Sequence, residues 1–113
     1  MACGLPVISG DCISGPREIL LEGGKEGKHL VFPVYGDYGI LMEDIAGEDR
    51  SRHFDPYIWA ENISQLMNNP LNTVYRGRSQ QRVLDFDKYA IIGKWVKLIN
   101  QEVKEVSDRK VAG

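Results

Sequence analysis

A chain of 113 residues is long enough for one small domain, and 42% apolar with 27% charged residues is an ordinary globular composition. The formal net charge is −2, and the 14 lysines and arginines are spread along the chain without a long basic run. This argues against a nucleic-acid partner and against broad attraction to a membrane surface. No stretch approaches the roughly 18 consecutive apolar residues of a membrane span.

The first residues and the two cysteines indicate the cellular compartment. Residues 1–9 are apolar but have no basic leader and carry a central proline, so they do not read as a signal peptide. Cys3 and Cys12 form no CxxC pair and have no histidine at metal-ligand spacing, so no metal site is expected. Two partly buried thiols in a reducing compartment are the simplest interpretation. The sequence therefore predicts a cytoplasmic, single-domain protein.

The first part of the chain predicts one strand followed by one helix. Leu5–Ser9 is a short apolar run bounded by turn residues, which is typical of a strand buried on both faces of a parallel sheet. A helix is predicted over residues 16–22, because a proline suits its first turn and Ser14 or Gly15 can cap it. The glycine pair at 23–24 ends it.

Two further strands are predicted at residues 30–32 and 38–42, with a Gly36-Asp37 turn between them. If Val7-Ile8 pairs in parallel with Ile40-Leu41, the helix lies on the connection between them. Such a crossover is expected to be right-handed. The fold class that follows is α/β, with a small, mostly parallel sheet of two or three strands packed against helices.

Helical patterning follows a polar segment, Glu43–Phe54, which is expected to be a surface loop. Asp55-Pro56 is a capping residue followed by a first-turn proline, so a helix should begin there. Its apolar residues fall at helical spacing, and the face that carries them is expected to pack inward. These residues are Trp59, Ile63, Leu66 and Met67.

A second helix is predicted from about residue 71 to residue 83, and a third begins after Asp85 or Asp87. Their apolar residues recur at spacings of three and four and are expected to face a core. These residues are Leu71, Val74, Tyr75, Tyr89, Ile92, Trp95, Ile99 and Val103. Residues 107–113 lose this periodicity and are expected to be a frayed tail. The predicted domain is therefore 1–106.

Catalytic motifs are scarce. There is no GxGxxG, P-loop or HExxH motif, and neither His29 nor His53 lies near a nucleophile motif. Loop carboxylates such as Asp85 are most often simply solvated. The tryptophans are better explained as helix-packing core than as a stacking platform. We therefore expect no catalytic residue and no metal ligand in the chain.

One segment carries a specific pattern: Met1-Ala2-Cys3-Gly4-Leu5-Pro6-Val7-Ile8-Ser9, then Asp11, then Ser14-Gly15-Pro16-Arg17-Glu18-Ile19-Leu20. It closely resembles a signature block of the retaining, nucleotide-sugar-dependent glycosyltransferases called group 1 or family 4. Members typically read Glu-Ala-Met-Ala-Cys-Gly-x-Pro-Val-Ile, then Asp, then Gly-Pro-x-Glu-Ile. Tyr38–Met42 is similar to the family's YGILV strand, and Val83–Trp95 to its RxxDFxxxxIxxxW stretch. The resemblance covers most of the chain.

The resemblance implies a fold in which two Rossmann-like domains face each other across a cleft, the GT-B arrangement. In that family the C-terminal domain holds the nucleotide sugar and the N-terminal domain holds the acceptor. The chain would be the C-terminal part of the donor domain, which is a partial Rossmann-like domain. Its last helix would cross back to the acceptor domain, so residues after Ile99 would lack that support here.

The resemblance also assigns donor-binding positions. Met1–Gly4 would end a helix alongside the nucleotide, and the loop Asp11–Gly15 would lie at the rim of the site, where exposed N–H groups favour negative charge. By the residues alone, Gly15-Pro16 and Glu18 are explained at least as well as ordinary helix-start chemistry. The positions carried over are Cys3, Gly4, Asp11, Ser14, Gly15, Pro16 and Glu18.

The groups that act on the donor in relatives lie before the position of Met1. They are two glutamates and the Arg and Lys that hold the diphosphate, so the chain is expected to be inactive by itself. An excised piece and a short reading frame beginning at an internal Met both fit. The implied donor is a nucleotide sugar, by default a UDP sugar, and the implied acceptor is a polysaccharide or lipid-linked glycan. Peripheral membrane association would come through regions outside the chain, and no other cofactor is expected.

A different class of function also fits. The chain could be a non-catalytic α/β interaction module that complements another polypeptide. Without neighbouring strands, Leu5–Ser9 would leave an open sheet edge, and open edges favour pairing with another chain or with a second copy.

Overall fold

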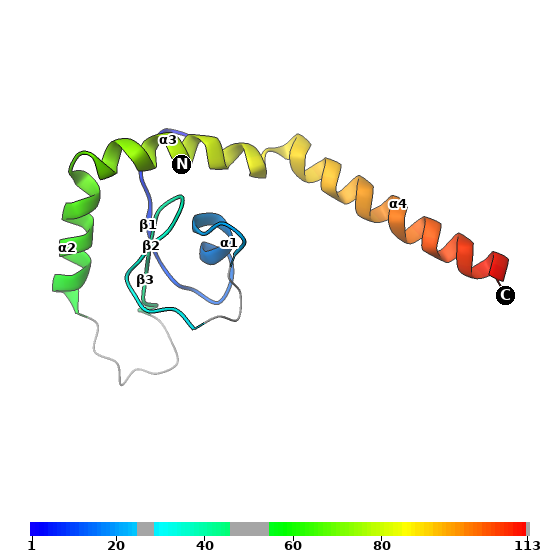
Figure 1. Cartoon of the computed structure of the whole chain (residues 1–113), viewed down its shortest axis with the longest axis horizontal. Coiled ribbons are helices and arrows are strands. Elements are labelled where there is room, and N and C mark those ends of the chain that lie inside the picture. Colours follow the sequence, from blue (N-terminus) through cyan, green and yellow to red (C-terminus); the bar gives the residue numbers. More distant parts are fainter. Residues whose placement is uncertain (25–28, 46–54, 113) are drawn as a thin grey trace. The chain divides into compact units, whose positions relative to one another are not determined.

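The computed structural model describes residues 1–24, 29–45 and 55–112. They form two compact units, Met1–Arg82 and Val83–Gly113, here called the sheet unit and the C-terminal unit. In chain order the elements are β1 (Ile8–Gly10), α1 (Pro16–Leu20), β2 (Val34–Tyr35), β3 (Ile40–Met42), α2 (Pro56–Met67), α3 (Leu71–Val83), the 3₁₀ helix η1 (Leu84–Phe86) and α4 (Lys88–Ala112) (Figure 1). The α/β class predicted from the sequence is confirmed, and the small sheet with its helices is compatible with a partial Rossmann-like domain.

The sheet has three strands in the order β1-β3-β2. β1 and β3 are parallel, with Ile8 opposite Ile40 and Ser9 opposite Leu41, which is the pairing that was the condition for a crossover through the helix. β2 is antiparallel to β3. The sheet is therefore mixed rather than mostly parallel, because the chain passes from α1 to the far edge and turns back into the centre.

The edge strand β2 lies at Val34–Tyr35, and the strand predicted at 30–32 is wrong. The Gly36 N–H donates to the Gly39 carbonyl at 2.9 Å and closes a tight turn. Because a tight turn fixes the register of the strands that it joins, the residues directly before Gly36 pair with β3. Leu30 and Phe32 instead pack against the buried residues around Leu41.

The core lies on both faces of β3, whose three residues are all buried. Ile40 and Met42 face Leu66 of α2 and Tyr75 of α3. Leu41 points to the other face and packs with Leu20 and Leu21 at the end of α1. Alternate residues of a strand point to opposite faces, so helices cover both sides of this short sheet, as Figure 1 shows.

β1 is less buried than the sequence predicted. Its residues Ile8–Gly10 are half-buried, and Leu5, the first residue of the predicted strand, is 62% exposed. The strand begins later than the predicted residues 5–9 and forms one edge of the described sheet. An edge strand has a neighbour on one side only, which explains why β3 and not β1 is the fully buried strand.

The helices of the sheet unit differ from the predictions in their buried faces. α1 ends at Leu20, two residues before the predicted end. On α2 the buried residues are Asn62 and Leu66, whereas Ile63 is 40% and Met67 is 74% exposed. Asn62 can be buried because its side chain accepts a hydrogen bond from the Tyr35 hydroxyl at 2.5 Å and donates to the Ile58 carbonyl at 2.8 Å.

α3 buries one predicted residue and one that the apolar pattern did not indicate. Tyr75 is 3% exposed and donates its hydroxyl to the Gly36 carbonyl at 2.8 Å, and burial raises the pKa of that hydroxyl. Ser79, one helical turn further on, is fully buried and donates to the Tyr38 carbonyl at 3.4 Å. Val74, predicted to face inward, is 42% exposed. The two buried residues of α3 therefore both donate a hydroxyl hydrogen bond to the turn of residues 36–39.

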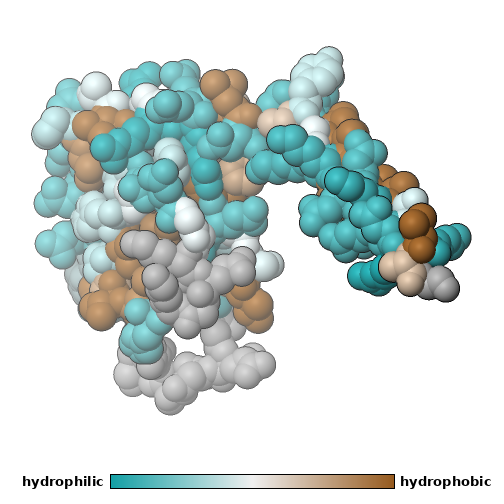
Figure 2. All heavy atoms as spheres, turned by 45° about the vertical axis from the view of Figure 1, so that its right-hand side comes forward, coloured by the Kyte–Doolittle hydropathy of each residue, from teal (hydrophilic) through white to brown (hydrophobic). Residues whose placement is uncertain are grey.

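The C-terminal unit is mainly the helix α4, which continues through Ala112 where the sequence predicted a frayed tail. Glu105 and Arg109 lie one turn apart with 3.8 Å between their charged groups, and no glycine or proline interrupts the helix after Gly93, so helical propensity carries it on. No residue of α4 is buried. The predicted core residues Tyr89, Ile92, Trp95, Ile99 and Val103 are all more than half exposed, and Figure 2 shows hydrophobic residues at the surface of this helix.

No helix among the described residues is both long enough and apolar enough to cross a bilayer. The predicted surface loop is described only in part, because residues 46–54, which include His53, lie outside the described residues. Gly113, at the end of the predicted tail, also lies outside them.

Candidate functional site

The residues with the clearest chemical arrangement lie where β1 ends. The backbone N–H of Asp11 donates to the Met42 carbonyl at 2.8 Å, which extends the pairing of β1 with β3 by one bond. The chain then leaves the sheet and reaches Gly15, where α1 begins. The loop of residues 11–15 therefore stands at the carboxyl end of a parallel strand, the end at which α/β sheets commonly bind ligands.

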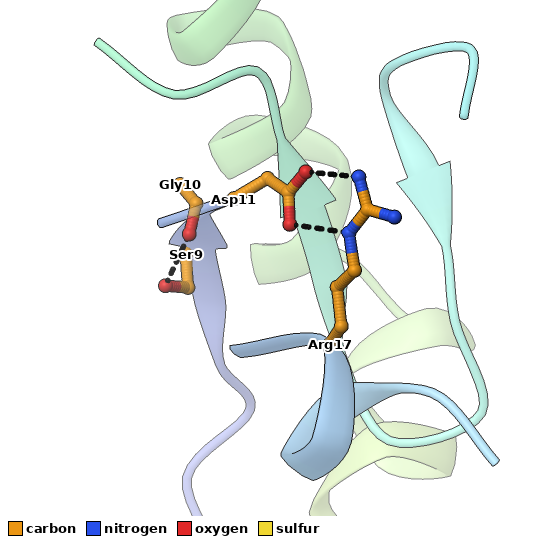
Figure 3. A network of polar contacts seen from close by, with 4 residues as sticks. All are labelled: Ser9, Gly10, Asp11 and Arg17. Carbon is orange, nitrogen blue, oxygen red and sulfur yellow. Dashed lines mark hydrogen bonds and ion pairs between the residues drawn. The ribbon is translucent and has the colours of Figure 1, made fainter. Parts of the chain in front are cut away.

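An ion pair crosses this loop. Arg17, in the first turn of α1, donates from Nε to one carboxylate oxygen of Asp11 at 2.8 Å and from a terminal nitrogen to the other at 2.6 Å (Figure 3). The side chains are 22% and 11% exposed. The side-chain hydrogen bond to Asp11 raises the pKa of the Arg17 guanidinium, so it stays charged. A bidentate, partly buried pair of this kind fixes both distance and orientation, so it pins the start of α1 to the end of β1.

Gly15 occupies a backbone conformation that requires glycine. Its φ is 99° at the N-cap position of α1. A Cβ atom placed there would have no described atom within 4 Å, so the backbone faces open space on that side. Of the two capping residues that the sequence allowed, Ser14 or Gly15, the N-cap is Gly15; no side chain caps the helix, and Ser14 is exposed. Pro16 follows as the first-turn proline that the sequence predicted.

The structure divides the seven positions that the resemblance assigned to donor binding into two groups. Asp11, Ser14, Gly15, Pro16 and Glu18 follow β1 and lie together in the loop and α1, with Ser14 and Glu18 exposed. Cys3 and Gly4 precede β1 and lie towards its other end, near the chain terminus marked N (Figure 1). The buried Gly4 contacts α3 through its carbonyl, which accepts from Arg76 Nε at 3.0 Å.

Both cysteines are exposed rather than partly buried. Cys12 lies in the loop after β1, and Cys3 lies in a turn closed by a hydrogen bond from the Gly4 N–H to the Met1 carbonyl at 2.9 Å. Within the described residues no three His, Cys, Asp or Glu side chains are grouped as metal ligands would be.

The arrangement is suited to binding more than to catalysis. The Asp11 carboxylate is held by Arg17, so it could act as a base or ligand only by giving up two hydrogen bonds. What the loop offers is its backbone groups, the Ser14 hydroxyl and the open side of Gly15. These groups can form hydrogen bonds with a ligand.

Sequence reasoning missed the basic residues that hold this region together. Arg17 is the partner of Asp11, and Arg82 on α3 donates to the Glu18 and Ile19 carbonyls at 2.5 and 3.1 Å. The motif contains Arg17 in a helix first turn six positions after Asp11, which is the signal that could have suggested the pair. Nothing local to Arg82 points to α1, because their contact joins residues more than sixty positions apart.

Removing one partner of the ion pair should cost stability. We expect Asp11→Asn or Arg17→Gln to lower the free energy of unfolding by about 1–2 kcal/mol, between the values for exposed and for buried pairs. The double variant should lose less free energy of unfolding than the two single variants lose together, because each single change already breaks the same interaction. Urea denaturation followed by circular dichroism measures all three.

The exposed pair on α4 provides the control. Glu105 and Arg109 are 46% and 80% exposed and 3.8 Å apart, so Glu105→Gln should change stability by less than about 0.5 kcal/mol. Strictly additive losses at Asp11 and Arg17 would show that the two side chains do not act as a pair.

Comparison with known proteins gives one relationship. The chain is 34% identical, over an alignment of 107 residues that covers 88% of it, to an uncharacterized glycosyltransferase of Methanocaldococcus jannaschii. It spans about a quarter (26%) of that relative's length. No family model matches the chain, and no solved structure matches it. The chain is therefore a homologue of part of a protein that is named a glycosyltransferase.

Proposed function

We propose that the chain is the C-terminal part of the nucleotide-sugar-binding domain of a retaining GT-B glycosyltransferase of group 1, or family 4. In this proposal the loop of residues 11–15 forms part of the rim of the donor site. The donor is a nucleotide sugar, by default a UDP sugar, and the whole enzyme transfers the sugar to a polysaccharide or lipid-linked glycan in the cytoplasm. The chain alone is inactive.

The observation that carries the proposal is the β1–loop–α1 unit within a segment homologous to a glycosyltransferase. A parallel strand ends at Gly10, a loop follows, and a helix starts at a glycine whose backbone is open on one side. Because carboxyl ends of parallel strands are where such sheets bind ligands, this loop is a reasonable place for part of a sugar or phosphate. The inactivity is proposed because the chain spans about a quarter of its relative's length and because the Asp11 carboxylate is held by Arg17.

Calorimetric titration with UDP-glucose tests the proposal. A longer chain that adds about 100 residues before Met1, the size of a further small domain, should bind the donor, whereas the 113-residue chain should show no heat of binding. Adding the upstream residues supplies the diphosphate-binding groups that the proposal places there. A longer chain that folds but binds neither UDP nor UDP-glucose would overturn the proposal. Tight binding of UDP by the short chain would overturn its claim that the chain lacks the essential groups.

The second candidate is a non-catalytic interaction module. It is favoured by β1, which forms an edge of the described sheet, and by α4, on which no residue is buried. The same titration distinguishes the two candidates, because an interaction module has no reason to gain donor binding when it is lengthened. Sedimentation of the 113-residue chain would then report the self-association that an open edge favours.

A further inference from the structure

Each of the last four backbone carbonyls of α1 accepts a hydrogen bond from a residue that follows the helix in the chain. The Arg17 carbonyl accepts from the Leu21 N–H, and the Leu20 carbonyl accepts from the Tyr38 N–H at 3.1 Å. Between them, the Glu18 and Ile19 carbonyls accept from Arg82. A helix leaves its last four carbonyls without intrahelical partners, and here a cation supplies the partners for two of them.

This matters because α1 has only five residues. A helix so short does not form by its own propensity, since the cost of nucleation exceeds what one turn of hydrogen bonds returns. Contacts at its two ends must therefore hold it in place. At the start it is held by the ion pair of Arg17 with Asp11, and at the end by Arg82.

Arg82 is itself well anchored. Its guanidinium carbon lies 4.6 Å from the centre of the Tyr38 ring, a cation–π distance. The turn that carries Tyr38 is fixed to the same helix, because Tyr75 donates to the Gly36 carbonyl and Ser79 donates to the Tyr38 carbonyl. α3 therefore holds both the turn that carries Tyr38 and the Arg82 guanidinium that is hydrogen-bonded to the end of α1.

We propose that Arg82 is a positioning residue for the loop of residues 11–15. By capping the end of α1 it fixes the direction of that helix, and through the pair at the other end it fixes the loop and Gly15. Because its guanidinium is hydrogen-bonded to the Glu18 and Ile19 carbonyls, Arg82 acts on the loop through α1. The consequence for donor binding rests on the function proposed above, whereas the effect on α1 does not.

Hydrogen exchange in the 113-residue chain tests the capping. In Arg82→Gln the Ile19 and Leu21 amides, which donate to the Gly15 and Arg17 carbonyls, should exchange at least about tenfold faster, a change of local opening by roughly 1.4 kcal/mol. The Met42 amide of β3 and the amides of α2 should change by less than about twofold. Arg82→Lys should recover part of the protection, since an ammonium reaches one carbonyl but lacks the planar fork that spans two.

Arg78→Gln is the matched control. Arg78 lies one turn earlier on α3 and donates to the Asp37 carbonyl at 3.4 Å, whereas Arg82 donates to carbonyls of α1. Its substitution should leave the α1 amides unchanged. Equal acceleration by both variants, or acceleration spread evenly over β3 and α2, would show that Arg82 stabilises the fold in general and would overturn the proposal. If Arg82→Gln does not fold, the exchange of the α1 amides is compared between Arg82→Lys and Arg78→Lys, and faster exchange in Arg82→Lys alone is then the expected result.

Donor affinity gives the second readout. In the longer chain, Arg82→Gln should weaken UDP-glucose binding by about tenfold and Arg78→Gln by less than about twofold. Unchanged affinity together with faster α1 exchange would mean that α1 is capped by Arg82 but does not position the donor, which overturns the positioning role. Absence of donor binding in the unsubstituted longer chain would instead count against the proposed function, while the exchange result would still stand.

Discussion

Replacing Gly39 by alanine is expected to lower the free energy of unfolding of the sheet unit by about 3 kcal/mol or more. A Cβ at this position would lie 2.6 Å from the Val7 carbonyl oxygen and 2.8 Å from Cδ2 of Leu20. The Leu20 side chain could change its rotamer, but the Val7 carbonyl accepts the Ile40 N–H at 3.0 Å. The backbone can relieve the contact only by weakening the pairing of β1 with β3. Urea denaturation followed by circular dichroism measures the loss.

Gly77 provides the control for this substitution. It lies inside α3, and a Cβ there would meet no described atom within 4 Å. Gly77→Ala should therefore stabilise the protein by about 0.5–1 kcal/mol, because alanine is the better helix former. A Gly39→Ala variant as stable as the unsubstituted chain would mean that Gly39 and Val7 are not packed as described.

The second large effect is expected at the centre of the sheet. Leu41 is fully buried and packs with Leu20 and Leu21 on the α1 side of β3. Leu41→Ala should cost about 3 kcal/mol, within the 2–5 kcal/mol typical of such a truncation, because the lost transfer energy adds to the cost of the cavity. Urea denaturation followed by circular dichroism measures the loss of stability of this variant as well.

Met67 tests whether the buried face of α2 is the one described. The sequence pattern places Met67 inward, but the side chain is 74% exposed. Met67→Ala should therefore change stability by less than about 0.5 kcal/mol. A loss comparable to that of Leu41→Ala would contradict the described orientation of α2.

Both large effects bear on the candidate site. β3 pairs with β1 up to Gly10 and accepts the backbone hydrogen bond of Asp11 through Met42. Weakening the centre of the sheet therefore loosens the place from which the loop of residues 11–15 departs. For that reason a functional test of the loop needs variants such as Asp11→Asn that leave β3 intact.

The sequence alone determined features whose signals are local. The start of α2 is one, since Asp55 accepts a hydrogen bond from the Tyr57 N–H at 2.9 Å and Pro56 follows it. The start of α1 at Gly15-Pro16 is another. Each of these depends on residues a few positions apart or on one strong pattern.

The candidate site was predicted only in part. The motif indicated Asp11 and Gly15, and the structure places both in one loop at the end of β1. It could not indicate that Asp11 is held by Arg17 or that Cys3 is exposed rather than partly buried. A resemblance names positions, whereas the distance between them depends on where the strand begins and ends.

Tertiary structure alone decided which faces meet. Apolar spacing favoured Ile63 for the core, but Asn62 is buried because the Tyr35 hydroxyl on a distant strand offers it a partner. Arg82 caps α1 for the same kind of reason. A polar side chain becomes interior only when another part of the chain satisfies its hydrogen bonds, and that partner is invisible in a window of neighbouring residues.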